Sequence, residues 1–378
     1  MSIPSDGIDP PESLPAPGRR LEAAGHWESA VRVVTTAAEL DALSPEWQVL
    51  AARAGPLQRI EWVQAWVATL LPRDAHGLRL TCIRRNGRLV ALAPLVPRYY
   101  AGWRRLEQAG VREISEPQDL LYADDAALTA LLTELLRQSE PLAFERLPES
   151  SHVPTLLRAV AGRRRWVQVS THAPYPSLDL RIDSDQALNA GRRSDLRRAL
   201  RRAGRHGEPR FELLAPIERE VDALYESVMA VEAASWKGRA GTALRQDARL
   251  GTFFHDYARR AARAGILRIA RLHLGTSVAA AQYAVECGDA WWLFKIGYDA
   301  RFADCSPGQL LMQHTLRVAR ERGLARYELQ GVAADWTRLW PCTEHASIAV
   351  RTYRWGPAAL AAAATLGAEL LRRRLGNS

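Results

Sequence analysis

Three consecutive strand patterns followed by a sharp turn and a helix pattern constrain the fold of this chain more than any other feature. The strand patterns lie within 265–299, where apolar, aromatic-rich runs are separated by short glycine-containing turns. Ser306, Pro307 and Gly308 then open a stretch with helical apolar spacing, and a further strand pattern covers 325–331. This order predicts an α/β (α+β) fold with a mostly antiparallel sheet and a crossover helix.

The turn at Ser306 has the features of an anion site. Serine is a preferred N-cap residue, and proline suits the first helical position. Gly308 leaves room beside backbone N–H groups that lack helical partners, where the helix dipole places roughly +0.5 of a charge. The turn therefore predicts a phosphate site, although a helix that is simply well capped has the same signature.

The first half of the chain shows a similar order of strands and helices. Asn86-Gly87 predicts a hairpin, and helix patterns cover 37–54 and 125–138. The proline-rich start of the chain has the composition of a disordered leader. The predicted divisions are the leader (1–25), a first unit (26–170), a second unit (171–356) and a C-terminal helix (357–378).

Three segments of the second half resemble a known family. They are VEAASWKGRAGTAL (231–244), FKIGYDARFADCSPGQLLMQHTLRVARERG (294–323) and YELQGVAADWTRLW (327–340). They look like GNAT-superfamily acyltransferases, in the CelD-like branch of cellulose and exopolysaccharide biosynthesis, which is related to FemAB-like transferases. The resemblance implies tandem GNAT-like units with mixed, mostly antiparallel central sheets flanked by helices. The first unit would be degenerate, and the second would be the acyl-CoA-binding catalytic domain.

The resemblance also implies an activity. A GNAT-type N-acyltransferase moves an acyl group, most simply acetyl, from acyl-CoA to an amino group. Acetyl-CoA or another acyl-CoA would be the co-substrate, with no metal, and the acceptor would be a sugar, a polysaccharide precursor or a small amine. Two alternatives stay open: an aminoacyl-tRNA-dependent transferase of FemAB type, and a non-catalytic binding subunit of a polysaccharide biosynthesis system.

Acyl transfer to an amine needs a neutral nitrogen, correct placement and stabilisation of the thioester oxygen. Because a lysine-like amine has a pKa of about 10.4, a positioned carboxylate must take its proton at neutral pH. Glu232 is the first candidate for this base and Asp335 the second, while Tyr298 is a candidate proton donor to the leaving thiolate. Glu328 is a further carboxylate of this region. The predicted cofactor-binding residues are Ile296, Gly297, Ser306, Pro307, Gly308, Gln309 and Leu310, and the predicted substrate-binding residues are Trp236, Lys237 and Asp299.

These candidates also have structural interpretations. Glu232 fits a helix-surface ion pair equally well, and tryptophans such as Trp236 are more often core residues than ligand contacts. Cys305 lies at a helix N-terminus, where thiolates are favoured, but the sequence shows no histidine partner for a nucleophile. The histidines show no metal-ligand spacing, so no metal site is predicted.

Charge adds a bias towards anionic ligands. The net charge is +9, from 51 basic and 42 acidic residues. Seven arginines in 192–205 recur at helical spacing, which predicts a basic stripe with Leu196 and Leu200 opposite. The stripe is compatible with tRNA, an anionic lipid or polysaccharide, CoA phosphates, or a solvated face. Without aromatic interleaving or a known nucleic-acid module, specific nucleic-acid recognition is not expected.

Cysteine usage and the C-terminal stretch bear on location. Four scattered cysteines without a signal peptide predict a cytoplasmic protein. The alanine-rich stretch 358–371 is too short to span a bilayer, which favours a packing helix over a membrane-surface helix. Any association with a membrane or a polysaccharide synthase would therefore be peripheral.

Overall fold

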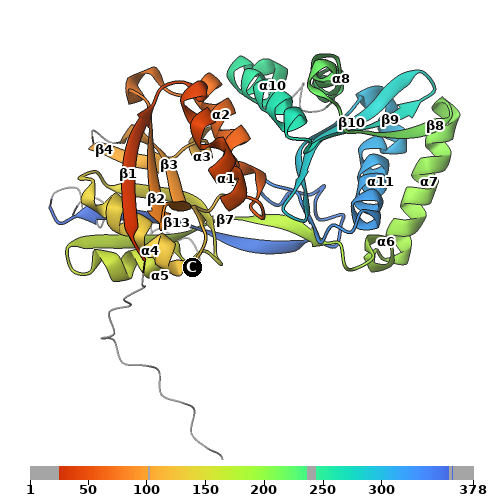
Figure 1. The fold of residues 1–378 in the computed structure, drawn as a ribbon. Coiled ribbons are helices and arrows are strands. Elements are labelled where there is room, and N and C mark those ends of the chain that lie inside the picture. Colours follow the sequence, from red (N-terminus) through yellow and green to blue (C-terminus); the bar gives the residue numbers. More distant parts are fainter. Residues whose placement is uncertain (1–24, 101–102, 236–243, 357–359, 361–378) are drawn as a thin grey trace, which may run out of the picture.

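The computed structural model describes residues 25–100, 103–235, 244–356 and 360. Figure 1 shows two groups of elements, one from each half of the chain, connected by the long strands β7 (Arg165–Asp179) and β13 (Thr343–Arg354). The predicted leader, almost all of the predicted C-terminal helix, and the candidates Trp236 and Lys237 lie outside the described residues.

The strands of the described residues form one 13-stranded sheet across both halves. Its order is β1-β2-β3-β4-β6-β13-β7-β12-β11-β10-β9-β8, and β5 pairs with β3 off this path. All pairs are antiparallel except β4 with β6 and β11 with β12. The bounds are β1 Trp27–Val34, β2 Leu78–Arg85, β3 Arg88–Tyr100, β4 Trp103–Gln108, β5 Leu121–Tyr122, β6 Leu142–Pro148, β7 Arg165–Asp179, β8 Pro209–Leu214, β9 Leu267–Leu274, β10 Ser277–Cys287, β11 Ala290–Tyr298, β12 Arg326–Glu328 and β13 Thr343–Arg354.

Helices flank this sheet, which confirms the predicted fold class. The α-helices are α1 Ser44–Leu50, α2 Ile60–Thr69, α3 Val111–Ile114, α4 Asp125–Arg137, α5 Val153–Ala161, α6 Ser184–Ala187, α7 Ala190–His206, α8 Val221–Ala233, α10 Ala248–Arg263 and α11 Pro307–Glu321. The 3-10 helices are η1 Ala37–Leu43, η2 Pro56–Gln58, η3 Arg73–Ala75, η4 Glu218–Glu220, η5 Leu244–Gln246 and η6 Ala300–Cys305.

The two halves repeat one arrangement of strands. β1-β2-β3-β4-β6 in the first half corresponds to β8-β9-β10-β11-β12 in the second, and each series ends in its parallel pair. The strand that follows each series crosses to the other half: the end of β7 pairs with β12, and β13 pairs with β6. Because of this exchange, the two central sheets that were expected form one continuous sheet. The predicted division at residue 170 falls inside β7.

An aromatic cluster holds the halves together. The indole of Trp62 on α2 lies between α10 and β11, with ring centroids 4.8 Å from Phe253, 4.9 Å from Tyr257 and 5.4 Å from Phe294. Trp62 is 1% exposed. Because these rings come from both halves, their burial fixes how the halves are placed.

On the opposite face of the second half, α7 and α11 cover the sheet. Leu196, Ala199 and Ala203 of α7 pack with Leu311 and Leu316 of α11. The expectation that Leu200 would share this apolar side is wrong, since its side chain is 45% exposed. The buried row follows a three-then-four spacing, which places Leu200 at the edge of the contact.

Several predicted elements have different bounds in the structure. The helix pattern at 37–54 divides into η1 and α1, and the predicted strand 325–331 ends at Glu328. β12 stops there because Gln330 and Gly331 adopt left-handed backbone angles, with φ of 59° and 60°. β13 was not predicted. Within the described part of the chain, no helix has the length and apolarity needed to cross a membrane.

Candidate active site

The strands β11 and β12 separate after a short parallel ladder. Their last paired residues are Trp292 and Glu328. β11 continues beside β10 to Tyr298, whereas the chain after Glu328 turns away at Gln330. The sheet is therefore split beyond this pair, and the open edge of β11 faces the gap.

A β-bulge in β11 sets the direction of its side chains along the split. Leu293 pairs with Ala284, but Lys295 pairs with Tyr283, so Phe294 is the additional residue. Bulges redirect side chains in this way. As a result Ile296 and Tyr298 pack on the α7 and α11 side. Gly297 faces α8 instead.

The predicted anion turn begins α11. Ser306 is the N-cap residue, but its backbone is left-handed (φ 48°, ψ 53°) and its side chain forms no capping bond, so the expected serine cap is wrong. The N–H groups of Gln309 and Leu310 donate to the carbonyl oxygen of Ser306, at 3.0 and 3.3 Å. Pro307 has no N–H. The N–H of Gly308 is thus the main-chain donor at this helix end that no helical carbonyl can reach.

Gly308 itself lies against the end of β11. A Cβ added at this position would meet the ring of Tyr298 at 3.5 Å, which is an ordinary contact. The predicted proton donor and the predicted phosphate turn are therefore neighbours. Tyr298 is partly buried.

The arginine-rich helix α7 lies beside this turn. Near its start, Arg192 Nη2 donates to Gln309 Oε1 at 2.8 Å, and the guanidinium lies over the ring of Trp340 at 5.9 Å. The predicted helical stripe is present, and Arg197, Arg201 and Arg205 are exposed. Arg192 thus contacts the start of α11, and the exposed arginines follow it along the same helix.

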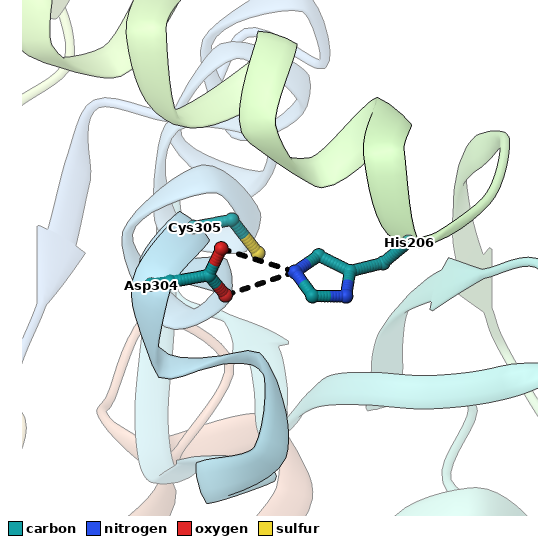
Figure 2. A group of neighbouring side chains, drawn as sticks. All are labelled: His206, Asp304 and Cys305. Carbon is teal, nitrogen blue, oxygen red and sulfur yellow. Dashed lines mark hydrogen bonds and ion pairs between the residues drawn. The ribbon is translucent and has the colours of Figure 1, made fainter.

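The end of α7 is held to the residues before the turn, as Figure 2 shows. His206 Nε2 lies 2.9 and 3.1 Å from the two carboxylate oxygens of Asp304. Cys305 Sγ donates to the carbonyl oxygen of Phe302 at 3.1 Å, and burial raises the pKa of this thiol. Because the thiol is kept protonated, the cluster acts as a clamp on the turn and a nucleophilic role for Cys305 is disfavoured.

Sequence spacing could not reveal this cluster. The potential ligand atoms of His206, Asp304 and Cys305 lie within 4.8 Å of one another, although the histidine is far from the other two along the chain. These are residue types that bind divalent metals. Here the imidazole and the carboxylate are paired with each other, and the thiol is bonded to the backbone.

On the other face of the split, a pocket of about 190 Å³ lies where the two halves meet. Trp292 and Glu328, the last pair of the parallel ladder, both line it. Tyr327 and Leu329 pack on the α11 side, so Glu328 between them points to the pocket side of the sheet. The first half contributes Gln58, Gln118 and Asp119, and the second half also contributes Tyr175, Arg326 and Gln330.

Two carboxyl groups of this pocket have raised pKa values. Glu328 is 7% exposed, and its burial raises the pKa although Arg326 lies 3.7 Å away and opposes the shift. Burial also raises the pKa of Asp119, to about 6, against hydrogen bonds from Ser151 and from the backbone N–H of Leu120. Carboxyl groups that titrate nearer to neutral pH are candidates for proton transfer.

The structure places Glu232 on the same side of the sheet, at the end of α8. It is 2% exposed, and its Oε2 accepts from the backbone N–H of Leu244 at 3.1 Å. A Cβ added to Gly297 would lie 2.8 Å from Glu232 Cα. Gly297 therefore allows α8 to approach β11 closely, and this approach brings Glu232 to the split.

Two other predicted carboxylates are engaged elsewhere. The side chain of Asp335 is 102% exposed and forms an ion pair of 3.3 Å with Arg338. Asp299 accepts from the backbone N–H of Arg301 at 2.9 Å and pairs with its guanidinium at 2.7 Å, which lowers the pKa of Asp299. The structure thus brings Glu232, Gly297, Tyr298 and the turn together, whereas Asp335 lies in solvent.

Residues from the first half were missed by sequence analysis. Gln118 and Asp119 belong to a loop between α3 and β5 that carries no recognisable motif. The one local signal was Pro117, which marks a loop and not a site.

The second half matches a known family. Residues 190–338, from α7 to the loop after β12, match the family model described as "Acetyltransferase (GNAT) domain". This region is therefore similar to a GNAT domain. It contains the split, the turn at Ser306 and Glu232, and the match indicates transferase activity. No curated protein gives a significant sequence match.

Solved structures extend the similarity of fold to most of the chain. FemX is 11% identical with a TM-score of 0.59, covering 82% of this chain and 96% of FemX. A conserved protein of unknown function from Bacteroides thetaiotaomicron is 9% identical with a TM-score of 0.55, covering 86% and 100%. The C-terminal domain of a protein assigned as a lysylphosphatidylglycerol synthetase from Agrobacterium fabrum is 12% identical with a TM-score of 0.53, covering 89% and 97%. At these identities the similarity shows the fold alone.

Proposed function

We propose that this chain is an acyl-CoA-dependent N-acyltransferase, most simply an acetyltransferase, that acts on an amino group. The observation that carries the proposal is the turn at Gly308, whose backbone N–H lies at the start of α11 where no helical carbonyl can reach it, directly beside the split of the matched region. Such a turn suits a pyrophosphate, because the N–H groups and the helix dipole both favour negative charge.

The split sheet supports the rest of the donor site. The open edge of β11 at Ile296 and Gly297 would hold the extended part of the donor, and the turn from Ser306 to Leu310 would hold its phosphates. The acyl group would then lie where the parallel ladder ends, next to Trp292 and Glu328.

The reaction needs one base and one acid. In our proposal the base takes a proton from the amine, the nitrogen attacks the thioester carbonyl carbon, a C–N bond forms and the C–S bond breaks. Glu328 and Glu232 are the candidate bases, because both are buried on the acceptor side of the split. Glu328 is preferred, since it lines the pocket and burial raises its pKa. Tyr298 is the candidate acid for the leaving thiolate because it lies beside Gly308.

For the acceptor we propose an amino group on a sugar or polysaccharide precursor, as the CelD-like resemblance implies. A cytoplasmic location fits this proposal, since acyl-CoA is the donor and all four cysteines are free thiols.

A second candidate is aminoacyl transfer from tRNA. The observation that favours it is the exposed row of Arg197, Arg201 and Arg205 on α7, beside the turn. A row of cations on one helix face attracts polyanions in general.

One binding experiment separates the two donors. Isothermal titration and thermal melting should show saturable binding of acetyl-CoA and a higher melting temperature, with uncharged tRNA giving only salt-sensitive, non-saturable binding. Tight, saturable tRNA binding without any effect of acetyl-CoA would overturn the proposal in favour of aminoacyl transfer.

A further inference from the structure

We infer that the pocket between the two halves binds a compact amine that also carries hydroxyl groups, with an amino sugar as the fitting class. Its role as acyl acceptor rests on the proposed function, but its binding does not. The pocket is lined by Gln118 and Asp119 from the first half and by Trp292, Glu328 and Gln330 from the second.

Two buried amides in this pocket have an unpartnered polar atom. Gln118 and Gln330 are each 5% exposed. Among the described residues, Gln118 Oε1 and Gln330 Nε2 have no hydrogen-bond partner. Buried polar atoms are rarely left in this condition, so each is suited to a hydrogen bond with an ordered water or with a polar group of a ligand. One atom accepts and the other donates, which is the pattern that hydroxyl groups satisfy.

The backbone at Gln330 is held in a strained conformation by the first half. Its φ of 59° lies in the left-handed region, which is uncommon for a residue with a side chain. The neighbouring Gly331 donates its N–H to the carboxylate of Glu116, and its carbonyl oxygen accepts from Arg146 Nη2 at 2.5 Å. Strain of this kind persists only where surrounding contacts impose it, and it is concentrated at functional sites.

Charge in the pocket selects a cation over an anion. Asp119 and Glu328 are both acidic. Arg326, the basic residue of the lining, is shared between Asp289 at 3.0 Å and Glu328 at 3.7 Å. An ammonium group is therefore complementary to this lining, and a phosphate or carboxylate is not.

Shape and surface favour a single ring. The volume of about 190 Å³ is below the roughly 300–1,000 Å³ of pockets for larger ligands. Trp292 and Tyr175 supply flat apolar surfaces, and the ring of Tyr175 is held by stacking on His345 with centroids 5.3 Å apart. An amino sugar combines an apolar ring face, hydroxyl groups and one ammonium group.

The test measures binding without acyl-CoA, using D-glucosamine as the probe. D-glucose lacks the amine, and cyclohexylamine lacks the hydroxyl groups. Titration calorimetry should show saturable binding of D-glucosamine, with both comparison compounds at least about tenfold weaker, because each loses one set of contacts. Equal affinity for D-glucosamine and D-glucose would overturn the charge argument.

Substitution of the two glutamines separates a role in ligand binding from a role in stability. Gln118→Met and Gln330→Met should each weaken D-glucosamine binding by about tenfold or more. Gln330→Met should not lower the melting temperature of the free protein, because it removes an unpaired buried polar atom. Gln118→Met also removes the hydrogen bond from Gln118 Nε2 to the carbonyl oxygen of Leu57, so its binding is compared at a temperature where the variant is folded. Gln168→Met, a buried glutamine of β7 outside the pocket lining, is the matched control and should bind as wild type does.

The outcomes separate this inference from the proposed function. Absence of saturable D-glucosamine binding, or wild-type binding by both amide variants, would overturn the inference. A second outcome is that D-glucosamine binding requires both glutamines but the protein does not bind acetyl-CoA. This outcome would support the inferred pocket and contradict the proposed donor.

Discussion

The two halves share one arrangement of strands but differ after the third antiparallel connection. In the second half, β11 is followed by η6 and by the 15-residue helix α11, which begins at the Ser306 turn. In the first half, β4 is followed by the left-handed Gly110 and by α3, a helix of 4 residues. Within the described residues, only the second half therefore has a full helix at this place in the series, and its start faces the split.

The same place in the first half is filled with paired charges. Glu113 of α3 forms an ion pair with Arg98 and accepts from Trp66 Nε1 at 3.3 Å. Glu107, at the parallel pair of this half, is bound to Arg105 at 2.7 Å. Carboxylates at this place disfavour a phosphate. The comparison teaches that a repeated fold is not enough for a donor site, and we propose that the first half supports the acceptor pocket instead.

The largest effect is expected at Gly308. Gly308→Asp places a carboxylate beside Tyr298, where a phosphate is proposed, and repulsion should weaken acetyl-CoA binding by at least ~10²-fold. The helix should stay folded, because an acidic residue near a helix N-terminus is favourable. Titration calorimetry and circular dichroism measure the two effects.

Two control variants make the Gly308 result specific. Gly308→Ala adds a Cβ at an ordinary contact distance from Tyr298 and should bind acetyl-CoA nearly as wild type. Glu113→Gln tests the corresponding place in the first half and should not change acetyl-CoA binding by the folded protein. Normal binding by Gly308→Asp would show that the phosphates are held elsewhere.

The next effect concerns how the halves are joined. Trp62→Ala should lower the free energy of unfolding by roughly 3–5 kcal/mol, because it empties the centre of the shared aromatic cluster. Urea denaturation followed by circular dichroism measures this loss. Trp355→Ala, at a side chain that is 65% exposed, is the control and should change stability far less. Equal losses would contradict a joining role for Trp62.

The candidate bases can be ranked by kinetics. Glu328→Gln should lower kcat by ~10²-fold with little change in acetyl-CoA affinity, since a positioned general base contributes about that much. Asp335→Asn should leave kcat near wild type because its side chain is in solvent. If Glu232→Gln shows the large loss and Glu328→Gln does not, Glu232 is the base.

The smallest effect is a pH dependence from the first half. Asp119 has a folded-state pKa of about 6, above its ordinary value of 3.8. The folded protein therefore binds this proton more tightly, and stability should fall as pH rises from about 4 to about 6 and then level off. Asp119→Asn should remove this fall, with a gain above pH 6 of at most about 3 kcal/mol. Thermal melting across this range measures it, and an unchanged pH profile in the variant would contradict the assignment.

Local sequence was sufficient to predict several elements, including those of the proposed donor site. The three strands before Ser306, the helix after it and the Asn86-Gly87 turn all depend on neighbouring residues. Turn and helix preferences act over a few residues, so they can be interpreted without the rest of the fold. The type of fold followed from the order of these elements, and the family resemblance in 231–340 agrees with the GNAT match.

Tertiary structure alone decided the pocket proposed as the acceptor site. The exchange of β7 and β13 brings the loop with Gln118 and Asp119 to Glu328 and Gln330, over a long separation in sequence. The same is true of His206 and the turn before Ser306. No local sequence preference predicts that these distant residues lie close together. Their proximity depends on how the two halves bury their shared aromatic cluster and pair their central strands.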